Sequence, residues 1–505
     1  MRYADLLKSL GFRRDPFATT NADEEELLEA YFIEPPFFKA VYGDIAVPKS
    51  NIVYAPRGGG KTALKRKIEL ISRTDPFLCV TYNSFPTSGL KLSDIDQRFH
   101  LTNLVRILLV AILSAADTVG IEGLTTNDRH FLYLMAKVHL GGIDRAGLKD
   151  AISAVQNMPD KAKEAWNRFT GPIGIALNAV LSHFGFKAVE MSKFDAATGE
   201  IGDLMSQISF LVGLARPFGF QSTYILVDKI DESSLTGKAS QSLAFIRPVL
   251  SDLPLLEMEG LGFKLFLWDL PQSEAREFTR PDRVKSYTLH WSHSQLRQML
   301  SKRLLAHSAE RVNSITSITT SERDVDIDDL IVTLSGGSPR NIIRICKAVL
   351  DEQSEIDAGA VSISERALLR EIEAIAEELV GEALPSSILK DLKKLKRADF
   401  TVRHIYADVF KISQPSGLQK VQSWQDSGAV VKIGNRQEKR GNRPSNVYGV
   451  SSPIVLKNIF SDMDALDFWH KKVRFCVTCG EVLLRDWDTS KLHSCHACES
   501  AFSEE

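Results

Sequence analysis

The first part of the chain alternates short apolar runs with segments of helical periodicity. Four runs have the length and composition of buried strands: "SNIVYA" (50–55), "FLCVTYN" (77–83), "TYILVDKIDE" (223–232) and "GFKLFLWDLP" (262–271). The segment "TALKRKIELI" (62–71), by contrast, has helical spacing. Because parallel strands need crossover helices that cover both faces of a sheet, this alternation predicts an α/β fold with a parallel sheet.

Helical periodicity dominates much of the remaining chain. Residues 92–215 are too many for one crossover and predict a helical insertion, and residues 293–380 have an all-helical pattern. Short helices followed by two β-type runs, "GAVVKIG" and "SNVYGVS", predict a winged helix in residues 384–455. The first predicted domain is a core at 1–290, with its insertion at about 92–215. It is followed by a helical lid at 291–380, a winged helix at 384–460 and a Cys-rich tail at 470–505.

Composition and charge narrow this picture only slightly. A chain of 505 residues, 44% apolar and 25% charged, is ordinary for a soluble globular protein of about three domains. Its net charge of −2 means that any nucleic-acid surface must be local. The longest apolar run, "LVRILLVAILSAA" (104–116), is shorter than the roughly 20 residues that span a bilayer and contains Arg106, so it predicts a buried helix. Without a secretory signal at the N-terminus, we expect a cytoplasmic protein that makes no membrane contact.

The stretch "NIVYAPRGGGKTALKRKIE" (51–69) has the pattern of a phosphate-binding loop between a strand and a helix. The leading glycine of the usual pattern is replaced by Ala55, which adds one methyl group at the strand exit and should be tolerated. Backbone N–H groups would surround the phosphates of ATP, the lysine would neutralise them, and the threonine hydroxyl would bind Mg²⁺. The residues expected to contact the nucleotide are Arg57, Gly58, Gly59, Gly60, Lys61 and Thr62. A plain Gly-rich turn is the alternative.

An acidic group ends the apolar run "YILVD". A carboxylate at the tip of a neighbouring strand can bind the magnesium ion of a nucleotide, and Asp228 is the candidate. Many such ATPases have a glutamate directly afterwards as the base for water, but here the next residue is Lys229. We therefore predict Glu232 as the water-polarising residue, with Asp231 as the second candidate. In the alternative, this acidic pair caps a helix and hydrolysis is weak or absent.

Four motifs, in this order, resemble a known family. The segments "APRGGGKT", "YILVDKIDE", "FLWDLP…RPDR…W" and "GGSPRN" are similar to AAA+ ATPases of the origin-recognition initiator type and their STAND-like bacterial relatives. The resemblance covers roughly residues 20–350, and extends to about 450 with the winged helix. It implies an α/β P-loop NTPase core of the AAA+ type with a helical lid. The chain departs from the family pattern at Ala55, at Lys229 and in its long insertion.

The resemblance also implies roles for residues outside the phosphate loop. Asp269, which ends the run "FLWD", would sense the γ-phosphate, although a helix-capping role fits it nearly as well. Arg280 and Arg283 would act as arginine fingers toward a neighbouring subunit of a nucleotide-dependent homo-oligomer, or would form surface salt bridges. Arg340, in "GGSPRN" (336–341), would reach the γ-phosphate from the lid.

The winged-helix segment offers a candidate nucleic-acid surface. Its predicted third helix, "SGLQKVQSWQDSG", carries Lys420 and Gln422, which would approach a groove. The tip between the two β runs is basic and would contact backbone phosphates. Its basic residues are Lys432, Arg436, Lys439, Arg440 and Arg443, against the single acid Glu438. A solvated hairpin in a protein-binding winged helix is the alternative.

The tail contains two Cys-x-x-Cys pairs separated by fifteen residues. The four cysteines are Cys476, Cys479, Cys495 and Cys498. This spacing predicts a zinc ribbon, and four thiolates would leave no open position on Zn²⁺, so the role would be structural. His493 and His496 are alternative ligands, and disulfides are disfavoured in the expected cytoplasmic location.

Together these features predict an ATP-binding and ATP-hydrolysing switch or remodeller. It would engage nucleic acid, DNA more than RNA, through its winged helix. If the chain is bacterial, family-level analogy suggests a role in antiphage or mobile-element defence. The alternative is a scaffold that binds nucleotide with little hydrolysis and recruits a protein partner.

Overall fold

The computed structural model describes most of the chain as two compact units. The described residues are 3–168, 170–171, 174–196, 202–233, 235–269, 272–436, 445–476, 478, 482–484, 498 and 500. The sheet unit is Glu34–Leu289, and the helical unit combines Met1–Ile33 with His290–Glu505. The N-terminal segment therefore lies with the C-terminal half of the chain, not with the sheet that follows it in sequence.

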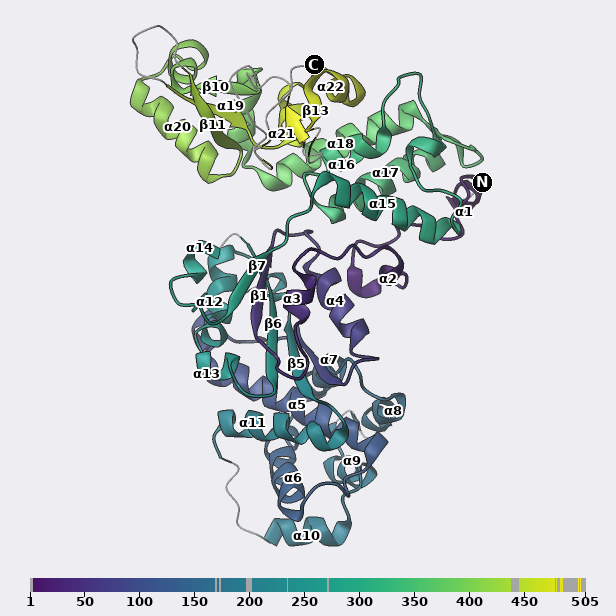
Figure 1. Ribbon diagram of the computed structural model, residues 1–505, viewed down its shortest axis with the longest axis vertical. Helices are drawn as coiled ribbons and strands as arrows, with labels where there is room; N and C mark the ends of the chain where they lie inside the picture. Colours follow the sequence, from purple (N-terminus) through teal and green to yellow (C-terminus); the bar gives the residue numbers. More distant parts are fainter. Residues whose placement is uncertain are drawn as a thin grey trace. The chain divides into compact units, whose positions relative to one another are not determined.

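The sheet unit is built on a five-stranded sheet in which all paired strands are parallel. The strand order is β2 (Phe77–Tyr82), β5 (Ser222–Val227), β6 (Leu261–Trp268), β1 (Asn51–Ala55) and β7 (Lys285–Thr288). Figure 1 labels the last four of these strands side by side. All residues of β1, β2 and β5 are buried, because both faces of a parallel sheet are covered. The predicted α/β P-loop NTPase fold is thereby confirmed. The apolar pattern does not predict β7, which is short and partly exposed.

Helices connect the strands of this sheet and form a long insertion. Helix α3 (Phe38–Tyr42) precedes β1, and the connecting helices are α4 (Lys61–Ile71), α12 (Ala239–Leu250), α13 (Leu253–Leu256) and α14 (Gln272–Ala275). The insertion between β2 and β5 contains α5 (Gln97–Val119), α6 (Thr126–Leu140), α7 (Arg145–Ala154), α8 (Asp160–Arg168), α9 (Leu177–His183), α10 (Ala188–Ala196) and α11 (Leu204–Leu214), with the short strands β3 (Thr170–Gly171) and β4 (Gly174–Ile175). Helix α5 packs against α6, α7, α8 and α11 and is the centre of this insertion (Figure 1).

Helix α5 contains the longest apolar run of the chain. Among the described residues it is the one helix long and apolar enough to cross a membrane, with a mean hydropathy of 1.8 over its most apolar window. However, 83% of that window is buried inside the protein. The prediction of a buried helix is confirmed, because the apolar side chains of α5 face other helices of the sheet unit and the sheet itself.

The helical unit joins the N-terminal segment to a helical bundle. Its helices before the winged helix are α1 (Tyr3–Ser9), α2 (Leu28–Tyr31), α15 (His293–Ser308), α16 (Ile327–Leu334), α17 (Pro339–Asp357) and α18 (Glu365–Ala383). Helix α1 packs on α17, and α2 packs on α15. These contacts bury apolar side chains of the N-terminal segment and of the bundle in one core, including Leu6, Phe17 and Ile343.

One buried ion pair ties the N-terminal segment to α15. The Arg303 guanidinium, whose side chain is 3% exposed, donates to the Glu25 carboxylate and to the Pro16 carbonyl. The same guanidinium lies 4.7 Å from the centroid of the Tyr31 ring. A paired and hydrogen-bonded arginine is the form in which a charge can be buried without a large desolvation cost.

A winged-helix fold follows the bundle. Its helices are α19 (Ser386–Leu395), the π-helix His404–Val409 and α20 (Gln414–Asp426). Its antiparallel sheet has the order β10 (Asp399–Thr401), β12 (Ser445–Val450) and β11 (Val430–Arg436). The rings of Phe400 and Trp424, with centroids 5.7 Å apart, pack the sheet against α20. The described part of the chain then continues through α21 (Pro453–Ile459), α22 (Ala465–Lys472), β13 (Val473–Phe475) and β14 (Val482–Leu484).

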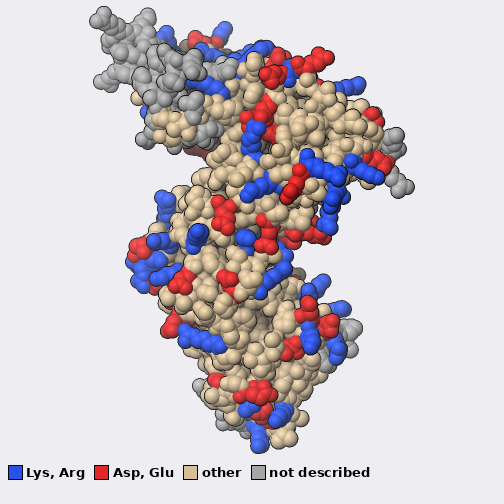
Figure 2. Space-filling model, turned by 45° about the vertical axis from the view of Figure 1, so that its right-hand side comes forward, with Lys and Arg blue, Asp and Glu red and all other residues tan. Residues whose placement is uncertain are grey.

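Positive and negative side chains are interspersed on the face of the molecule seen in Figure 2. This mixture agrees with the net charge of −2, the difference between 62 basic and 64 acidic residues. Any surface for a polyanion must therefore come from a local excess of lysine and arginine.

Candidate nucleotide-binding site

The Gly-rich loop has the backbone of a phosphate nest. It begins where β1 ends at the buried Ala55 and finishes at Gly60, the N-cap of α4. Gly60 has φ 96° and Gly58 has φ 74°, left-handed values that favour glycine. A Cβ atom on Gly59 would lie 3.0 Å from the Pro56 carbonyl oxygen, so a side chain there would be crowded. Strand, loop and helix thus present the N-terminus of α4 to an anion.

The loop lysine folds back over the start of the loop. The Lys61 ammonium donates to the carbonyl oxygens of Ala55, at 2.8 Å, and Pro56, at 3.1 Å. These carbonyls lie at the strand exit, where the usual glycine is replaced by alanine. The alanine methyl group is therefore compatible with a lysine that lies over the loop.

The two residues expected to bind Mg²⁺ lie together. The Thr62 hydroxyl donates to the Asp228 carboxylate at 3.0 Å. Asp228 follows β5 and is only 2% exposed, and its backbone N–H donates to the Tyr82 carbonyl on the neighbouring strand. A hydroxyl and a carboxylate are hard oxygen donors of the kind that Mg²⁺ prefers. The donor set therefore fits the metal ion that accompanies a nucleotide.

The chain turns sharply after Asp228. Lys229 has φ 59° and ψ 26°, a left-handed conformation that is uncommon for a residue with a side chain. The next three residues form a short 3₁₀ turn, in which Ile230 is buried and Glu232 is exposed. The departure from the family pattern at Lys229 thus coincides with a strained backbone, and the acidic pair lies one turn further along.

Arg57 clamps this acidic turn onto the phosphate loop. Its Nε donates to the Asp231 carboxylate at 2.8 Å, and a terminal nitrogen donates to the Asp231 carbonyl at 3.0 Å. The same nitrogen is 3.4 Å from the Gly237 carbonyl, and the guanidinium carbon lies 4.2 Å from the centroid of the Trp268 ring. The Asp231 carboxylate is therefore engaged, whereas the exposed Glu232 projects from the same turn. The sequence gives no local sign of this clamp, because Arg57 and Asp231 are 174 positions apart.

Asp269 follows the strand that separates the loop from Asp228. In the sheet, β6 pairs with β1 on one side and β5 on the other, and Trp268 lies opposite Ala55 in the register. The partly exposed Asp269 therefore lies at the edge of the sheet where the loop and Asp228 are found. Its backbone carbonyl also accepts from the Gln272 N–H at 3.0 Å, at the start of α14.

The two candidate arginine fingers form ion pairs within the sheet unit. Arg280 donates to the Asp282 carboxylate at 3.0 and 2.9 Å, and this pairing raises the arginine pKa. Arg283 makes a two-point contact with Glu257, with Nε 2.7 Å from the carboxylate. Both side chains are exposed. Both arginines therefore have partners in their own chain.

Arg340 lies in the helical unit, in the first turn of α17. The "GGSPRN" motif is a helix start: the Ser338 hydroxyl accepts from the Asn341 N–H at 3.3 Å, and Pro339 is the first helical residue. Arg340 is exposed at this turn. The phosphate loop belongs to the other unit, so the predicted contact of Arg340 with nucleotide stays a prediction.

A buried charge network lies behind the phosphate loop, on α4. Lys65 and Glu69 are 2% and 3% exposed and approach to 3.3 Å. The Glu69 carboxylate also accepts from the Thr81 hydroxyl of β2 at 2.6 Å and from Arg66 at 3.1 Å. The network fixes α4 to β2. Its sequence signal is the i, i+4 Lys–Glu pair in "KRKIE". This pair does not reveal its burial, because the same spacing is common on exposed helix faces.

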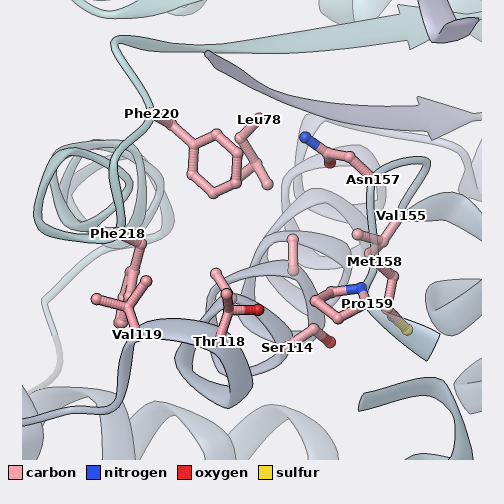
Figure 3. A pocket seen from close by; sticks show the side chains of 12 residues that line it. Leu78, Ser114, Thr118, Val119, Val155, Asn157, Met158, Pro159, Phe218 and Phe220 are labelled. Carbon is pink, nitrogen blue, oxygen red and sulfur yellow. The ribbon is translucent and has the colours of Figure 1, made fainter. Parts of the chain in front are cut away.

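A cavity of about 120 Å³ in the sheet unit lies away from this site. Figure 3 shows its mainly apolar lining, which includes Leu78 near the start of β2 and Phe218 and Phe220 before β5. The Asn157 amide at its edge is already used, since it donates to the Phe77 carbonyl and accepts from the Cys79 N–H. The cavity is thus at the opposite end of the strands from the phosphate loop.

The predicted wing and zinc ribbon are described only in part. Lys432 is exposed on β11 and the backbone of Arg436 ends that strand. The remaining tip residues, Lys439, Arg440 and Arg443, lie outside the described residues, as do Cys479 and Cys495. Within the described part of the chain no three potential ligands are grouped around a metal position.

The two described cysteines of the tail approach each other. The Sγ atoms of Cys476 and Cys498 are 3.7 Å apart, although they come from different Cys-x-x-Cys pairs. Two thiolates of a tetrahedral Zn²⁺ site with Zn–S bonds of about 2.3 Å lie about 3.8 Å apart. This separation is compatible with two ligands of one Zn²⁺ ion, and zinc binding by the tail stays a prediction.

No protein-family model and no curated protein matches the chain. Among solved structures, the Aeropyrum pernix ORC1 protein in complex with DNA is 13% identical, with 92% of this chain and 96% of that chain covered and a TM-score of 0.32. Drosophila ORC bound to DNA is 12% identical over 90% of each chain, with a TM-score of 0.30. The Aeropyrum pernix ORC2 protein with ADPNP and ADP is 12% identical over 89% of this chain and 98% of that chain, with a TM-score of 0.32. These similarities are too distant to establish a family for this chain.

Proposed function

We propose that this chain is an ATP-binding AAA+ ATPase of the origin-recognition type that acts as a nucleotide-dependent switch on DNA. The observation that carries the proposal is the 3.0 Å contact of the Thr62 hydroxyl with the buried Asp228 carboxylate, beside the Gly-rich loop. A plain turn between a strand and a helix has no need for a buried carboxylate at this position. A nucleotide site needs one, because the phosphates bring a magnesium ion with them.

Each residue of the site would have a separate role. The loop N–H groups would hold the phosphates, and Lys61 would leave the Ala55 and Pro56 carbonyls to neutralise them. Thr62 and Asp228 would hold Mg²⁺, which supplies charge neutralisation when bound. Asp269, and Arg340 from the lid, would respond to the γ-phosphate.

The first experiment measures ATP binding by calorimetry in the presence of Mg²⁺. Lys61→Ala and Asp228→Asn should each weaken binding by at least about tenfold, since each removes a charge that the phosphates or their metal ion contact. Lys149→Ala, which removes an exposed lysine on α7, is the matched control and should bind as the wild type does. Normal ATP binding by Lys61→Ala would overturn the assignment of the site.

For hydrolysis, we propose Glu232 over Asp231 as the water-polarising residue. The Asp231 carboxylate is paired with Arg57, whereas Glu232 is exposed on the same turn. Glu232→Gln should retain ATP binding and lower turnover by about a hundredfold. Unchanged turnover in this variant, with a loss in Asp231→Asn, would reverse the assignment.

A second candidate function is a scaffold that binds nucleotide with little hydrolysis and recruits a protein partner. Lys229 stands where a catalytic acid is usual, and Arg280 and Arg283 are already paired, which favours slow turnover. Steady-state ATPase assays with and without DNA and RNA, together with solution mass with and without ATP, distinguish the two. Stimulation by DNA and an ATP-dependent increase in mass support the switch, and a nucleotide-bound protein with negligible turnover under all conditions supports the scaffold.

We further propose that the tail binds one structural Zn²⁺ through Cys476, Cys479, Cys495 and Cys498. The 3.7 Å separation of the Cys476 and Cys498 sulfurs supports this, because the two come from different pairs. Zinc measured by mass spectrometry should be stoichiometric in the wild type and lost in Cys476→Ser. Cys346→Ser, which changes a buried cysteine of the bundle, is the control. Protein free of zinc after expression with zinc present would contradict the proposal.

A further inference from the structure

The first helix of the winged helix ends in a lysine-rich stretch. The sequence "KDLKKLKR" (390–397) carries five basic residues and one acid. Ile388, Leu392 and Leu395 are buried, so the apolar side of α19 packs into the domain and its lysines face outward. The helix ends at Leu395, and Lys396 follows with φ 47°, which turns the chain toward β10.

Acidic partners take up only part of this positive charge. Within residues 385–430 there are eight Lys and Arg residues and four Asp residues. Lys393 approaches Glu377 at 3.6 Å, and Arg397 approaches Asp399 at 3.5 Å. Lys420 is paired with Asp391 at 2.5 Å. The lysines that remain without an ion pair to any described residue are Lys390, Lys394, Lys396 and Lys411, which we call the lysine surface.

The members of the lysine surface come from neighbouring parts of the domain. Lys390 and Lys394 are one turn apart on α19 and share a face. The Lys394 ammonium lies 5.5 Å from the centroid of the Phe410 ring, and Lys411 directly follows Phe410 in the turn before α20. Lys411 has φ 52°, a left-handed conformation that places an exposed lysine in this turn. The surface therefore borders the N-terminal part of α20.

Helix α20 itself presents almost no charge to solvent. Its sequence contains one basic residue, Lys420, which is held by Asp391 and lies 4.7 Å from the Phe410 ring centroid. Its exposed side chains are mainly amides, hydroxyls and apolar groups: Gln414, Leu418, Gln419, Gln422 and Ser423. Amides can hydrogen-bond base edges in a groove but cannot neutralise phosphates. A groove-binding α20 therefore needs its positive charge from a neighbouring element.

We propose that the lysine surface binds the backbone phosphates of duplex DNA and positions α20 against a groove. This inference rests on the proposed engagement of DNA by the winged helix, but it assigns a different set of residues from the basic tip of the wing. Helices that precede a recognition helix contact the DNA backbone in helix-turn-helix proteins, so the location suits the role. Each lysine that neutralises a phosphate releases a counterion, which makes its contribution measurable from the salt dependence.

The test compares three full-length variants with the full-length wild type. The first variant replaces Lys390, Lys394, Lys396 and Lys411 with glutamine. The control variant replaces four exposed lysines of the sheet unit, Lys149, Lys161, Lys163 and Lys187, with glutamine and so loses the same charge. A rescue variant replaces the four lysines of the lysine surface with arginine. Binding of a short labelled duplex is followed by fluorescence anisotropy over a series of KCl concentrations.

We expect the glutamine variant of the lysine surface to bind at least about tenfold more weakly than wild type at moderate salt. The slope of log affinity against log salt should become shallower by about 3 to 4, the value for four lost phosphate contacts. The control and the arginine variant should keep the wild-type slope within about one. ATP binding by all variants, measured in parallel, verifies that the sheet unit is intact, and far-UV circular dichroism verifies the helical unit.

Three results would overturn the inference, and they have different consequences. If wild type binds the duplex and the glutamine variant binds with the same slope, the lysine surface does not contact phosphates, while the proposed DNA function stands. If wild type binds no duplex at any salt, the proposed DNA function fails and this inference fails with it. A labelled polyglutamate peptide is the second probe. If the lysine surface binds this peptide more tightly than duplex, its partner is an acidic protein segment and the phosphate assignment is wrong.

Discussion

Among single residues, Arg57 has the most informative environment in the candidate site. Its guanidinium contacts a carboxylate, two carbonyls and a tryptophan ring, and all of these belong to segments that follow β5 or end β6. An arginine in a phosphate loop is easily taken for a phosphate ligand. From these contacts we propose that Arg57 orients the turn that carries Glu232, and so acts through another residue.

Replacing Arg57 with alanine should therefore lower turnover more than binding. We expect ATPase activity to fall about tenfold, because the Glu232 turn loses its orientation, and ATP affinity to change by less than about threefold. Hydrogen exchange of residues 229–238 should become faster. Trp268→Phe, which keeps an aromatic ring under the guanidinium, is the control. A loss of ATP affinity as large as that of Lys61→Ala would mean that Arg57 binds phosphate directly.

His100 makes the stability of the sheet unit depend on pH. Its side chain is fully buried, between the Tyr82 hydroxyl at 3.0 Å and the Phe245 carbonyl at 2.8 Å, and burial lowers the pKa of the imidazole to about 4. The unfolded chain, with an ordinary histidine pKa near 6.5, then binds more protons than the folded chain between those values. The stabilisation is present above about pH 6.5 and is lost as pH falls toward 4.

We expect urea unfolding of the sheet unit to show this dependence. The contribution of His100 lost on acidification should reach up to about 3 kcal/mol, since one pKa unit corresponds to about 1.4 kcal/mol. His100→Gln, which does not titrate, should remove that part of the pH dependence of the urea midpoint. An identical pH dependence in this variant would assign the acid sensitivity to other groups.

The strands and helices differ in how well the sequence predicts them. Strands β1, β2, β5 and β6 follow from their continuous apolar runs, because both faces of the sheet are covered. Strand β7 has only four residues, which are exposed or half-buried, so its sequence has no distinguishing pattern. The phosphate loop and Asp228 follow from local motifs. The Arg57 clamp depends on a contact between distant segments, and no local pattern predicts it.

Helix α4 is held to the sheet by charge as well as by apolar packing. The buried Glu69 carboxylate joins Lys65 and Arg66 of α4 to Thr81 of β2. A buried charge whose partner is removed remains in a low-dielectric environment at a cost of about 3 to 5 kcal/mol. The network thus makes the position of α4 sensitive to one side chain.

We expect Glu69→Gln to destabilise the sheet unit by about 3 to 5 kcal/mol, because the Lys65 ammonium loses its carboxylate. The double variant Lys65→Met/Glu69→Leu, which removes both charges, should be markedly less destabilised. Hydrogen exchange of α4 and β2 is the measurement, with α17 of the helical unit as the internal reference. Equal destabilisation of the single and double variants would show that packing, not the ion pair, dominates.

At the scale of the whole molecule, the two units are not consecutive in the chain. The N-terminal segment packs with helices that begin after residue 290, and Arg303 pairs with Glu25 across 278 positions. Sequence patterns describe neighbours along the chain, so they group this segment with the sheet that follows it. Only the tertiary contacts reveal that it belongs to the helical unit.

The pairing of Arg303 predicts a strong effect of one N-terminal carboxylate. Glu25→Gln leaves a buried guanidinium without its counter-charge and should destabilise the helical unit by about 3 to 5 kcal/mol. Glu26→Gln, which removes the exposed partner of Arg14, should cost less than about 1 kcal/mol. Hydrogen exchange of α15 measures both. Similar exchange rates in the two variants would mean that the apolar contacts alone hold the segment.

The split of the helical unit has a consequence for synthesis on the ribosome. The N-terminal segment emerges before the sheet unit, but its partners in the bundle are translated only after the whole sheet unit, Glu34–Leu289, has been made. Until then Leu6, Leu7, Phe12 and Phe17, all buried in the finished protein, have no bundle to pack against. The sheet unit can fold during this delay, since domains generally fold as units while translation proceeds. The nascent chain thus exposes these apolar side chains while the sheet unit is being translated. During that interval a chaperone can bind the N-terminal segment.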